Sequence, residues 1–379
     1  MRKIRVVVNA IPLTNVRTGI GRYVESLYAV MEREYSDMFE FRYFDGVRLS
    51  ASLPSCSGDV GKWSRIASLF WRLPPRLAYS IRLARHRAAD RRLSRLSRGF
   101  DVYHETALIP YSVQENVATL LTVHDLSLRN CERFHPRERV MYFNRFFDDG
   151  VRQADAVAAV SEFTRRELLA AADVQPERVL VTPLACDQTV FHPQQRAGIE
   201  AVKTELGING GYFLFVGTND PRKNLSLAAE AVRRGSPDTP LVVVGWSGWG
   251  GALPDGTRDV GYVSDAILSH LYSGATALIY PSLYEGFGLP VLEAMACGCP
   301  VALAREASLP EVAGDAGCYA GAPQEVDEFA AILHRLATDE RFRAAKSGES
   351  VERAGLFSWE RTARLTKEAL LAACETKNS

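Results

Sequence analysis

The chain has 379 residues, more than one hydrophobic core usually supports, and its 47% hydrophobic and 24% charged content is typical of globular proteins. Forty-five basic residues balance 45 acidic ones, so the overall charge gives no reason to expect a nucleic acid or another polyanion as a partner. The seven cysteines are scattered and form no CxxC pair, which argues against a disulfide framework or a zinc site and favours a reducing compartment.

The first residues, MRKIRVVVNAIPL, combine basic side chains with a short β-branched run. This run has the length of a strand and is too short for the apolar core of a signal peptide. No stretch of the chain approaches the ~20 apolar residues of a membrane span. We therefore expect a cytoplasmic protein.

Short apolar strands alternate with amphipathic helices along the chain. Strands are expected at 4–9, 102–104, 118–124, 156–160 and 179–182, and again at 212–217, 241–244, 260–262, 277–280 and 301–304. Helices are expected between them, at 22–33, 137–152, 162–172, 226–234 and 325–338, with Ser161 as the cap of one of them. Apolar strands interleaved with helices predict parallel sheets that are covered on both faces.

The pattern begins twice, at IRVVVNAIP and at YFLFVGTNDP. We therefore expect an N-terminal domain at 1–190, a C-terminal domain at 191–360, and a last helix at 361–379 that packs back on the first domain. Two doubly wound domains that face each other leave a cleft, and ligands of such sheets bind at the carboxyl ends of the strands.

A basic segment interrupts the first domain at about 62–98, with eleven Lys or Arg residues and the single acid Asp90. Four apolar positions in it have helical spacing: Leu77, Ile81, Ala84 and Ala88. Such a helix could lie on an anionic membrane surface, or it could belong to a solvated helical insertion. The two interpretations have similar weight on the residues alone.

Two loops of the first half are candidates for ligand contacts. Gly19 and Gly21 follow the first expected strand and open a helix, which suits a tight turn against a ligand but also occurs in plain strand-to-helix turns. His124 ends another strand, where it could bind a sugar hydroxyl or stabilise developing charge. A lone histidine is more often structural, and Asp125 beside it is expected to cap a helix or support it.

Arg222 and Lys223 follow the first strand of the second half through the turn TNDP. Two adjacent cations at the end of a parallel strand suit a diphosphate, because arginine binds it with two hydrogen bonds and lysine acts as a point charge. The alternative is a solvated helix start, but cations there oppose the helix dipole. The pair therefore predicts an anion site.

The segment PSLYEGFGLPVLEAMACGC places Glu285 and Glu293 eight positions apart. Pro290 suits the first turn of a helix, whose free N–H groups and dipole favour a phosphate. Gly286 and Gly288 would let the backbone approach a ligand closely. A carboxylate on either side of a phosphate suits the hydroxyls of a nucleotide sugar, whereas an acid that stabilises the helix dipole explains only one of the two glutamates.

This segment resembles the signature of retaining glycosyltransferase family 4, in which an E-x7-E pair brackets GFGLP. The likeness extends over nearly the whole chain, through TGIGRYVESL, TVHDLSL, ADAVAAVSEFTRREL, FVGTNDPRKNL, GYVSDAILSHLYSGA and SLPEVAGDAG. It is strongest toward bacterial mannosyltransferases that build O-antigen and other cell-surface polysaccharides. The resemblance implies the α/β GT-B fold, with two doubly wound, Rossmann-like domains facing a central cleft.

The resemblance also assigns roles to residues. It implies catalytic roles for Glu285, His124, Arg222 and Lys223, and donor binding by Gly19, Gly21, Val263, Gly286, Phe287, Gly288, Leu289 and Glu293. The two cations and a helix end would hold the pyrophosphate in place of a metal ion, so neither metal nor cofactor is expected, in keeping with the lack of a DxD motif.

The implied reaction transfers a hexose, above all mannose from GDP-mannose, to a saccharide acceptor that is expected to be lipid-linked. The segment 62–98 would then give a peripheral contact with the inner face of the membrane. The same motifs also fit UDP- or dTDP-sugar donors, with glucosyl, N-acetylglucosaminyl or rhamnosyl transfer. A nucleotide-sugar epimerase and a non-catalytic sensor of sugar nucleotides are further alternatives, although a sensor would be expected to have lost a charged site residue.

Overall fold

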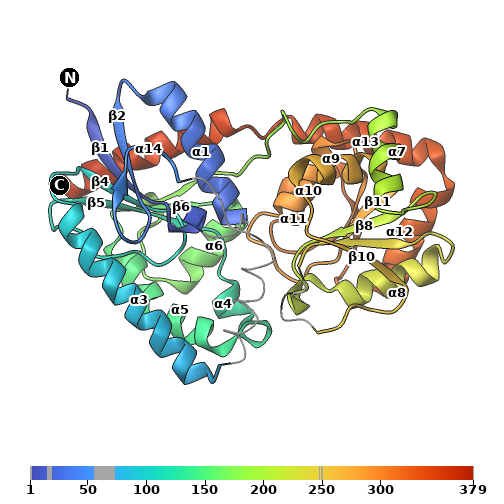
Figure 1. The fold of residues 1–379 in the computed structure, drawn as a ribbon, viewed down its shortest axis with the longest axis horizontal. Helices are drawn as coiled ribbons and strands as arrows, with labels where there is room; N and C mark the ends of the chain where they lie inside the picture. Colours follow the sequence, from blue (N-terminus) through green and yellow to red (C-terminus); the bar gives the residue numbers. More distant parts are fainter. Residues whose placement is uncertain (1, 15–18, 55–72, 247, 249–250, 379) are drawn as a thin grey trace. The chain divides into compact units, whose positions relative to one another are not determined.

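The computed structural model describes residues 2–14, 19–54, 73–246, 248 and 251–378 (Figure 1). The chain divides into two compact units. Unit 1 consists of Met1–Leu184 and Trp359–Ser379, and unit 2 consists of Ala185–Ser358. The polypeptide therefore leaves unit 1 after residue 184 and returns to it at Trp359.

Unit 1 is built on a seven-stranded sheet in the order β3-β2-β1-β4-β5-β6-β7. Its strands are β1 (Ile4–Asn9), β2 (Phe39–Phe44), β3 (Leu49–Ser50), β4 (Val102–Glu105), β5 (Ala118–Val123), β6 (Ala156–Ala159) and β7 (Val179–Val181). All neighbours pair in parallel except β2 and the short edge strand β3. The strands β4 and β6 are buried at every position, as expected for a sheet covered on both faces.

Helices cover both faces of this sheet. They are α1 (Gly19–Tyr35), α3 (Pro75–Leu96), α4 (Ser127–Asn130), α5 (Arg137–Gln153), α6 (Glu162–Ala171) and α14 (Trp359–Asn378), with 3-10 turns at Ile11–Thr14, Glu132–Phe134 and Pro176–Arg178. Leu93 of α3 and Phe143 and Phe147 of α5 are fully buried against one face of the sheet. Helix α14 packs on α1 and on β5 and β6.

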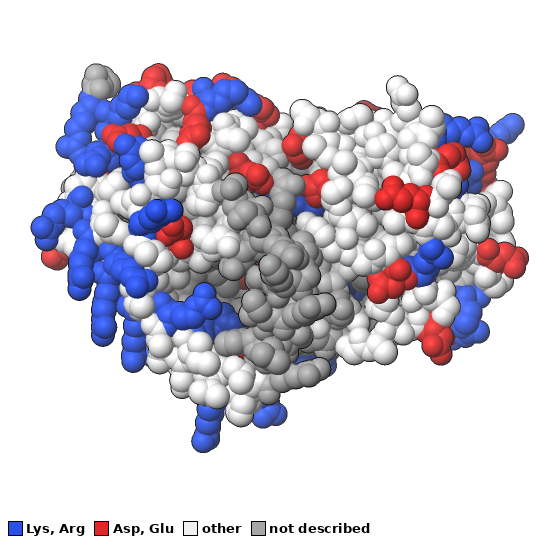
Figure 2. Space-filling model, in the orientation of Figure 1, with Lys and Arg blue, Asp and Glu red and all other residues white. Residues whose placement is uncertain are grey.

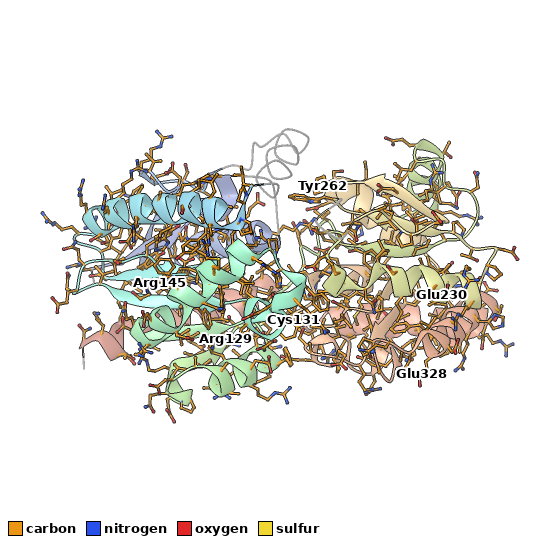
Figure 3. All side chains as sticks on the ribbon, turned by 90° about the horizontal axis from the view of Figure 1, so that it is seen from below. Arg129, Cys131, Arg145, Glu230, Tyr262 and Glu328 are labelled. Atoms are coloured by element: carbon orange, nitrogen blue, oxygen red, sulfur yellow. The ribbon has the colours of Figure 1, made fainter. Side chains whose placement is uncertain are left out.

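Polar anchors fix the shorter helices. Ser161 caps α6 by accepting a hydrogen bond from the Thr164 amide at 3.0 Å, as the sequence predicts. Arg129 of α4 donates to the Ala171 carbonyl at 2.7 Å and pairs with Asp148 of α5 at 2.5 Å, and Figure 3 shows it among the helices of unit 1. These contacts tie α4, α5 and α6 together.

Unit 2 contains a six-stranded parallel sheet in the order β10-β9-β8-β11-β12-β13. Its strands are β8 (Phe213–Val216), β9 (Leu241–Val244), β10 (Thr257–Gly261), β11 (Ala277–Tyr280), β12 (Val301–Ala304) and β13 (Cys318–Ala320). Its helices are α7 (Arg196–Glu205), α8 (Leu225–Gly235), α9 (Asp265–Gly274), α10 (Leu289–Ala296), α11 (Leu309–Ala313), α12 (Val326–Thr338) and α13 (Glu340–Ala354), with 3-10 turns at Pro221–Lys223 and Gly314–Ala316.

In chain order this sheet reads 3-2-1-4-5-6, which is the strand order of the dinucleotide-binding Rossmann fold. The order reverses between β8 and β11 in unit 2 and between β1 and β4 in unit 1. Loops leave in opposite directions at such a switch point, and ligands of open α/β sheets bind there. The predicted architecture of two doubly wound, Rossmann-like sheets is therefore confirmed.

Three strands escaped the sequence analysis, namely β2, β3 and β13. In β2, FEFRYF, the charged Glu40 and Arg42 break up the apolar run, although their neighbours Phe39 and Phe41 are buried. The strand expected at 260–262 is β10, which begins earlier, at Thr257. Its start was not predicted because β10 is an edge strand in which Arg258 and Asp259 are exposed, so these positions lack the apolar side chains that indicate a strand.

Part of the basic segment 62–98 lies outside the described residues, and the rest forms the helix α3. Its buried positions are Ala78, His86, Ala89 and Leu93. The predicted apolar stripe points elsewhere, because Leu77 and Ile81 are 50% and 37% exposed. Figure 2 shows Lys and Arg side chains gathered along the edge where Figure 1 draws α3. The helix thus combines a face packed on the sheet with an exposed face that is basic and partly apolar.

Within the described ranges, none of the helices is both long enough and apolar enough to cross a membrane.

Candidate active site

Three charged residues from two loops meet at the switch point of unit 2. Arg222 and Lys223 belong to the 3-10 turn that follows β8, and Glu285 lies on the loop that follows β11. Because β8 and β11 are parallel neighbours, both loops leave from the same edge of the sheet. The sequence predicted each of these residues separately, and the fold brings them into contact.

Glu285 is the centre of this ion cluster. Its Oε1 accepts hydrogen bonds from Lys223 Nζ and from the Ser282 hydroxyl, both at 2.6 Å. Its Oε2 lies 3.5 Å from Arg222 Nη1. Glu285 is only 7% exposed and Arg222 only 8%, so this cluster, defined as Arg222, Lys223 and Glu285, is largely shielded from water.

Burial alone would raise the pKa of Glu285, but the Lys223 ammonium and the Arg222 guanidinium outweigh it and lower this pKa to about 2. Glu285 is therefore ionised at neutral pH. Asp220 adds a second carboxylate 3.5 Å from Arg222 Nη2, so two cations face two anions. A diphosphate that arrived here would compete with the carboxylates for the same donors.

The loop after Glu285 is shaped by a glycine and a serine. Gly288 has φ 100°, a left-handed conformation, and a Cβ on it would lie 3.0 Å from Leu309. The Ser308 hydroxyl contacts the carbonyl oxygens of Glu285 and Phe287, at 3.0 and 2.9 Å. Ser308 holds the loop in place, and the sequence analysis missed it because it follows a different strand.

Helix α10 begins directly after this loop, with Pro290 in its first turn as predicted. None of the described side chains caps its N-terminus, and its first turn contains no acid. The residues just before and at the start of α10 are Gly286, Phe287 and Leu289. Phe287 is 4% exposed and packs edge-on against Phe357, with 5.8 Å between the ring centres. The positive end of the helix dipole gives this end a preference for an anion.

Glu293 and Val263 occupy other positions in unit 2. Glu293 lies on α10, is 2% exposed, and accepts a hydrogen bond from the Tyr272 hydroxyl at 3.3 Å. Val263 is buried and precedes Ser264, which caps α9 by accepting from the Ile267 amide. The donor-binding roles of Glu293 and Val263 stay predictions from the sequence.

In unit 1, His124 lies directly after β5. Its Nε2 donates a hydrogen bond to the Thr106 carbonyl at 2.7 Å. Its ring packs edge-on against the Tyr23 ring, with 5.0 Å between the ring centres. Burial lowers the pKa of His124, which keeps the ring neutral near pH 7. With Nε2 protonated, Nδ1 is an acceptor, and it has no partner among the described residues.

Gly19 and Gly21 lie in the first turn of α1, which follows β1. Gly21 is buried and Gly19 is exposed. Asp125 Oδ1 accepts from the Ser127 amide at 2.8 Å and so forms an Asx turn just before α4, whose N-cap residue is Leu126.

A buried hydrogen-bonded network that the sequence did not predict lies at the carboxyl edge of the sheet in unit 1. The Asn9 amide donates to both carboxyl oxygens of Glu105, at 2.8 and 2.9 Å, and the Tyr103 hydroxyl donates to Glu105 as well. His104 bridges Tyr28 on α1 and the Thr122 hydroxyl on β5. The signal that the sequence offered was a polar residue at the end of β1 and of β4, namely Asn9 and Glu105.

Two family models match the chain. The model for glycosyl transferases group 1 matches residues 199–351, and the model for glycosyltransferase family 4 matches residues 19–189. The O-antigen chain mannosyltransferase B of Escherichia coli is 33% identical over 375 residues, which cover 92% of this chain and 94% of that protein. The serotype-specific mannosyltransferase WbdA of Escherichia coli is 27% identical over 270 residues, 66% of this chain and 33% of that protein.

Solved structures share the fold over nearly the whole chain. The sucrose-phosphate synthase of Thermosynechococcus elongatus matches with a TM-score of 0.72 and 18% identity, covering 97% of this chain and 98% of that one. WaaG, a glycosyltransferase involved in lipopolysaccharide biosynthesis, matches with a TM-score of 0.68 and 14% identity, covering 96% and 99%. At these identities the likeness bears on the fold alone.

Proposed function

This chain belongs to the GT-B glycosyltransferases of family 4, and from that membership we propose that it transfers mannose from GDP-mannose to a saccharide acceptor and retains the anomeric configuration. The reaction would serve O-antigen or related polysaccharide synthesis, as the name of the Escherichia coli relative suggests. The observation that carries the proposal is the ion cluster of Arg222, Lys223 and Glu285 at the switch point of unit 2.

The cluster suits the departure of a nucleoside diphosphate. In the proposed reaction the bond between the sugar C1 and the phosphate oxygen breaks, and the diphosphate keeps the electron pair. Arg222, Lys223 and the N-terminus of α10 stabilise the charge that develops on it. The acceptor hydroxyl forms the new bond to C1 on the same face of the sugar and gives its proton to a diphosphate oxygen. This route needs neither a carboxylate nucleophile nor a metal ion.

The remaining site residues bind and orient the donor in this proposal. Glu285 accepts hydrogen bonds from the transferred sugar, and Glu293 accepts them from the ribose. His124 uses its free Nδ1 to accept a hydrogen bond from a hydroxyl of the sugar. Gly19 and Gly21 in unit 1, and Val263 and the 286–289 loop in unit 2, provide backbone contacts to the diphosphate and the base.

We further propose that the protein works in the cytoplasm and contacts the inner face of the membrane through α3. The exposed arginines of this helix are Arg76, Arg85, Arg87, Arg91, Arg92 and Arg95, and the exposed Leu77 and Ile81 lie on the same helix. Arg82 is not part of this surface, because its Nη2 lies 3.8 Å from the buried Glu138.

Flotation with vesicles that contain anionic lipid tests this contact. The wild type is expected to float, and a variant with Arg85, Arg91, Arg92 and Arg95 changed to Glu is expected to stay at the bottom of the gradient. Equal flotation of the two proteins would rule out this membrane surface.

The transferase proposal is tested by slow donor hydrolysis without acceptor, across GDP-, UDP- and dTDP-sugars and in the presence of EDTA. Release of mannose from GDP-mannose alone supports both the donor and the metal-free site. Hydrolysis of a UDP- or dTDP-sugar instead keeps the transferase and discards mannose. Conversion of the donor into another sugar nucleotide would show an epimerase.

A further inference from the structure

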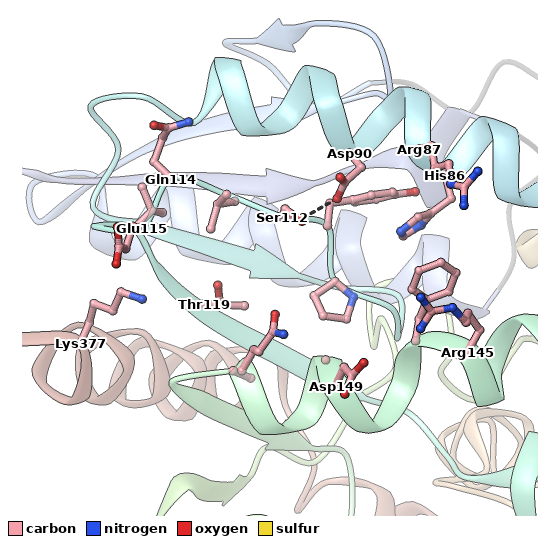
Figure 4. A pocket seen from close by; sticks show the side chains of 18 of the residues that line it. His86, Arg87, Asp90, Ser112, Gln114, Glu115, Thr119, Arg145, Asp149 and Lys377 are labelled. Carbon is pink, nitrogen blue, oxygen red and sulfur yellow. Dashed lines mark hydrogen bonds between the residues drawn. The ribbon is translucent and has the colours of Figure 1, made fainter.

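Unit 1 contains a groove of about 530 Å³ between α3 and α5, which no step of the proposed reaction uses (Figure 4). Its walls come from the inner side of α3, the segment 110–117 that follows β4, the last turns of α5, and Lys377 of α14. Its volume is that of a small-molecule site.

The groove extends toward the opposite edge of the sheet from His124. It is lined by Thr119 near the amino end of β5 and by Ala154, which connects α5 to β6. His124, in contrast, follows the carboxyl end of β5. A ligand in this groove would therefore occupy a site distinct from the reacting atoms.

One end of the groove is aromatic. His86 is 6% exposed, stacks on Tyr111 with 4.8 Å between ring centres, and lies 4.4 Å from the Phe146 ring. Burial lowers the pKa of His86, so the ring is neutral, and its Nδ1 is 2.6 Å from the Tyr142 hydroxyl. Its Nε2 has no partner among the described residues, which leaves one almost buried polar atom available to a ligand.

The charges around the groove balance. Three cations line it, Arg87, Arg145 and Lys377, and so do three carboxylates, Asp90, Glu115 and Asp149. Figure 4 shows these six side chains around the groove. Such a lining does not favour a phosphate or another anion, which would need an excess of cations. It favours a neutral ligand that offers both donors and acceptors.

Several hydrogen-bonding groups of the lining are unused. Within the described part of the chain, the side chains of Arg87, Ser112, Thr119 and Gln153 make no hydrogen bond or ion pair. Asp90 accepts only the Ser112 amide, at 2.7 Å. An aromatic surface beside free hydroxyl, amide, guanidinium and carboxylate groups suits a ligand that is rich in hydroxyls and has apolar ring faces.

We propose that this groove binds a neutral oligosaccharide, namely a stretch of the acceptor chain behind the residue that receives the sugar. The inference rests on the proposed transferase function and adds a second holding point for its acceptor. A longer acceptor would then gain affinity from the groove, because the second contact is made within one complex. A disaccharide too short to reach the groove would gain nothing.

The test uses a linear α-linked mannotetraose and compares Gln153→Trp, which fills the groove, with Asn144→Trp, an exposed position of the same helix outside it. Hydrogen exchange with mannotetraose is expected to show protection in α3 and α5 for the wild type and for Asn144→Trp. This protection is expected to be lost in Gln153→Trp. Its absence from the wild type, or its persistence in Gln153→Trp, overturns the proposal, as does its displacement by inorganic diphosphate.

Kinetics give an independent readout. For the wild type, kcat/KM with mannotetraose is expected to exceed that with mannobiose at least tenfold, and Gln153→Trp is expected to reduce this ratio to about 1. Donor hydrolysis without acceptor should be the same in all three proteins, because the groove lies outside the reacting site. If the wild type hydrolyses GDP-mannose but shows no dependence on the groove, the groove proposal alone fails. If it hydrolyses no donor, the transferase proposal fails, whatever the exchange data show.

Discussion

Each unit has a buried glutamate where its strand order reverses, and the two carboxyl groups have opposite surroundings. In unit 1, Glu105 ends β4 and is bound by the amide of Asn9 at the end of β1, and burial raises its pKa. In unit 2, Glu285 follows β11 and is bound by Lys223 from the turn after β8, and its pKa is lowered to about 2. The glutamate at the switch point is therefore hydrogen-bonded by a neutral amide in unit 1, whereas in unit 2 it forms ion pairs with cations.

This difference shows how one architecture can prepare two kinds of ligand contact. A charged cluster at a switch point can exchange one of its own anions for a ligand anion, which suits the diphosphate of a donor. In unit 1 the Asn9 amide and the Glu105 carboxyl group hydrogen-bond to each other and hold the ends of β1 and β4 together. This pair contains no cation, so it creates no site for an anion. The network in unit 1 suits the positioning of neutral groups, such as the His124 ring and sugar hydroxyls.

The largest effect is expected when a cation is removed from the ion cluster around Glu285 in unit 2. We expect Lys223→Met to lower kcat/KM for transfer about 10²–10³-fold, because a positioned charge on the leaving group is lost. The melting temperature should fall as well, since Glu285 loses the partner at 2.6 Å. Initial rates with GDP-mannose and calorimetry measure the two effects.

Lys203→Met is the matched control. Lys203 lies on α7 of the same unit and pairs with Glu200; their side chains are 13% and 55% exposed, and methionine keeps the buried apolar stem of Lys203. Its loss should change neither rate nor stability appreciably. If Lys223→Met transfers mannose as fast as this control, the ion cluster has no role in catalysis.

The second prediction concerns acid stability. Glu285 has a lower pKa folded than unfolded, so the folded state binds fewer protons and the stabilisation is complete above about pH 4.5. It is lost as the pH falls toward 2, at a cost on the order of 3 kcal/mol. Glu285→Gln cannot titrate, so its melting temperature should fall less between pH 6 and pH 3 than that of the wild type.

Glu205→Gln serves as the control, because Glu205 is an exposed residue at the end of α7 in the same unit and forms no ion pair within the described part of the chain. It should keep the pH profile of the wild type. An unchanged profile in Glu285→Gln would mean that Glu285 is not held ionised by its neighbours.

The third prediction separates the two functions of His124. In His124→Gln the amide Nε2 can still donate to the Thr106 carbonyl, but the acceptor at Nδ1 is lost. We expect kcat/KM to fall about 10- to 100-fold, as for one lost hydrogen bond to the substrate, with unchanged affinity for GDP in calorimetry.

His270→Gln, on α9, is the control, since the hydrogen bond of His270 goes to the Ala266 carbonyl of its own helix and its ring packs beside Gly198 of α7. Full activity of His124→Gln would exclude a sugar contact through Nδ1. A loss of GDP affinity in the same variant would instead indicate a contact with the nucleotide.

The smallest effect is expected at Glu105 and has the opposite sign to that at Glu285. Its pKa is raised by burial, so the folded state binds more protons than the unfolded state, and its contribution to stability declines as the pH rises above about 4.5. Hydrogen bonds from Tyr103 and Asn9 act in the opposite direction and lower this pKa. Glu105→Gln should therefore melt with a slightly flatter pH profile than the wild type between pH 5 and pH 8, as measured by calorimetry. A steeper profile would contradict the assignment.

The sequence was sufficient for the architecture because the alternation of apolar strands and amphipathic helices is a local signal. It also placed Arg222, Lys223 and Glu285 at strand ends, which share an edge in a parallel sheet. The contact of Asn9 with Glu105 could not be predicted, since it depends on the pairing of strands 96 residues apart.

Helix α3 shows a different limit. Its sequence offers two sets of apolar positions, and only packing on the sheet decides that Ala89 and Leu93 are buried while Leu77 and Ile81 remain exposed. The groove beside it could not be predicted from the sequence for the same reason, because its walls come from several separate segments of the chain.

The return of the chain to unit 1 at Trp359 has a consequence for biosynthesis. Helix α14 covers β5 and β6, yet the ribosome makes it only after the whole of Ala185–Ser358. At typical rates of 5–20 residues per second, part of the first sheet stays uncovered for on the order of 10 to 35 seconds. Unit 2 can fold during this interval, whereas unit 1 must wait as an incomplete domain for its last helix to emerge.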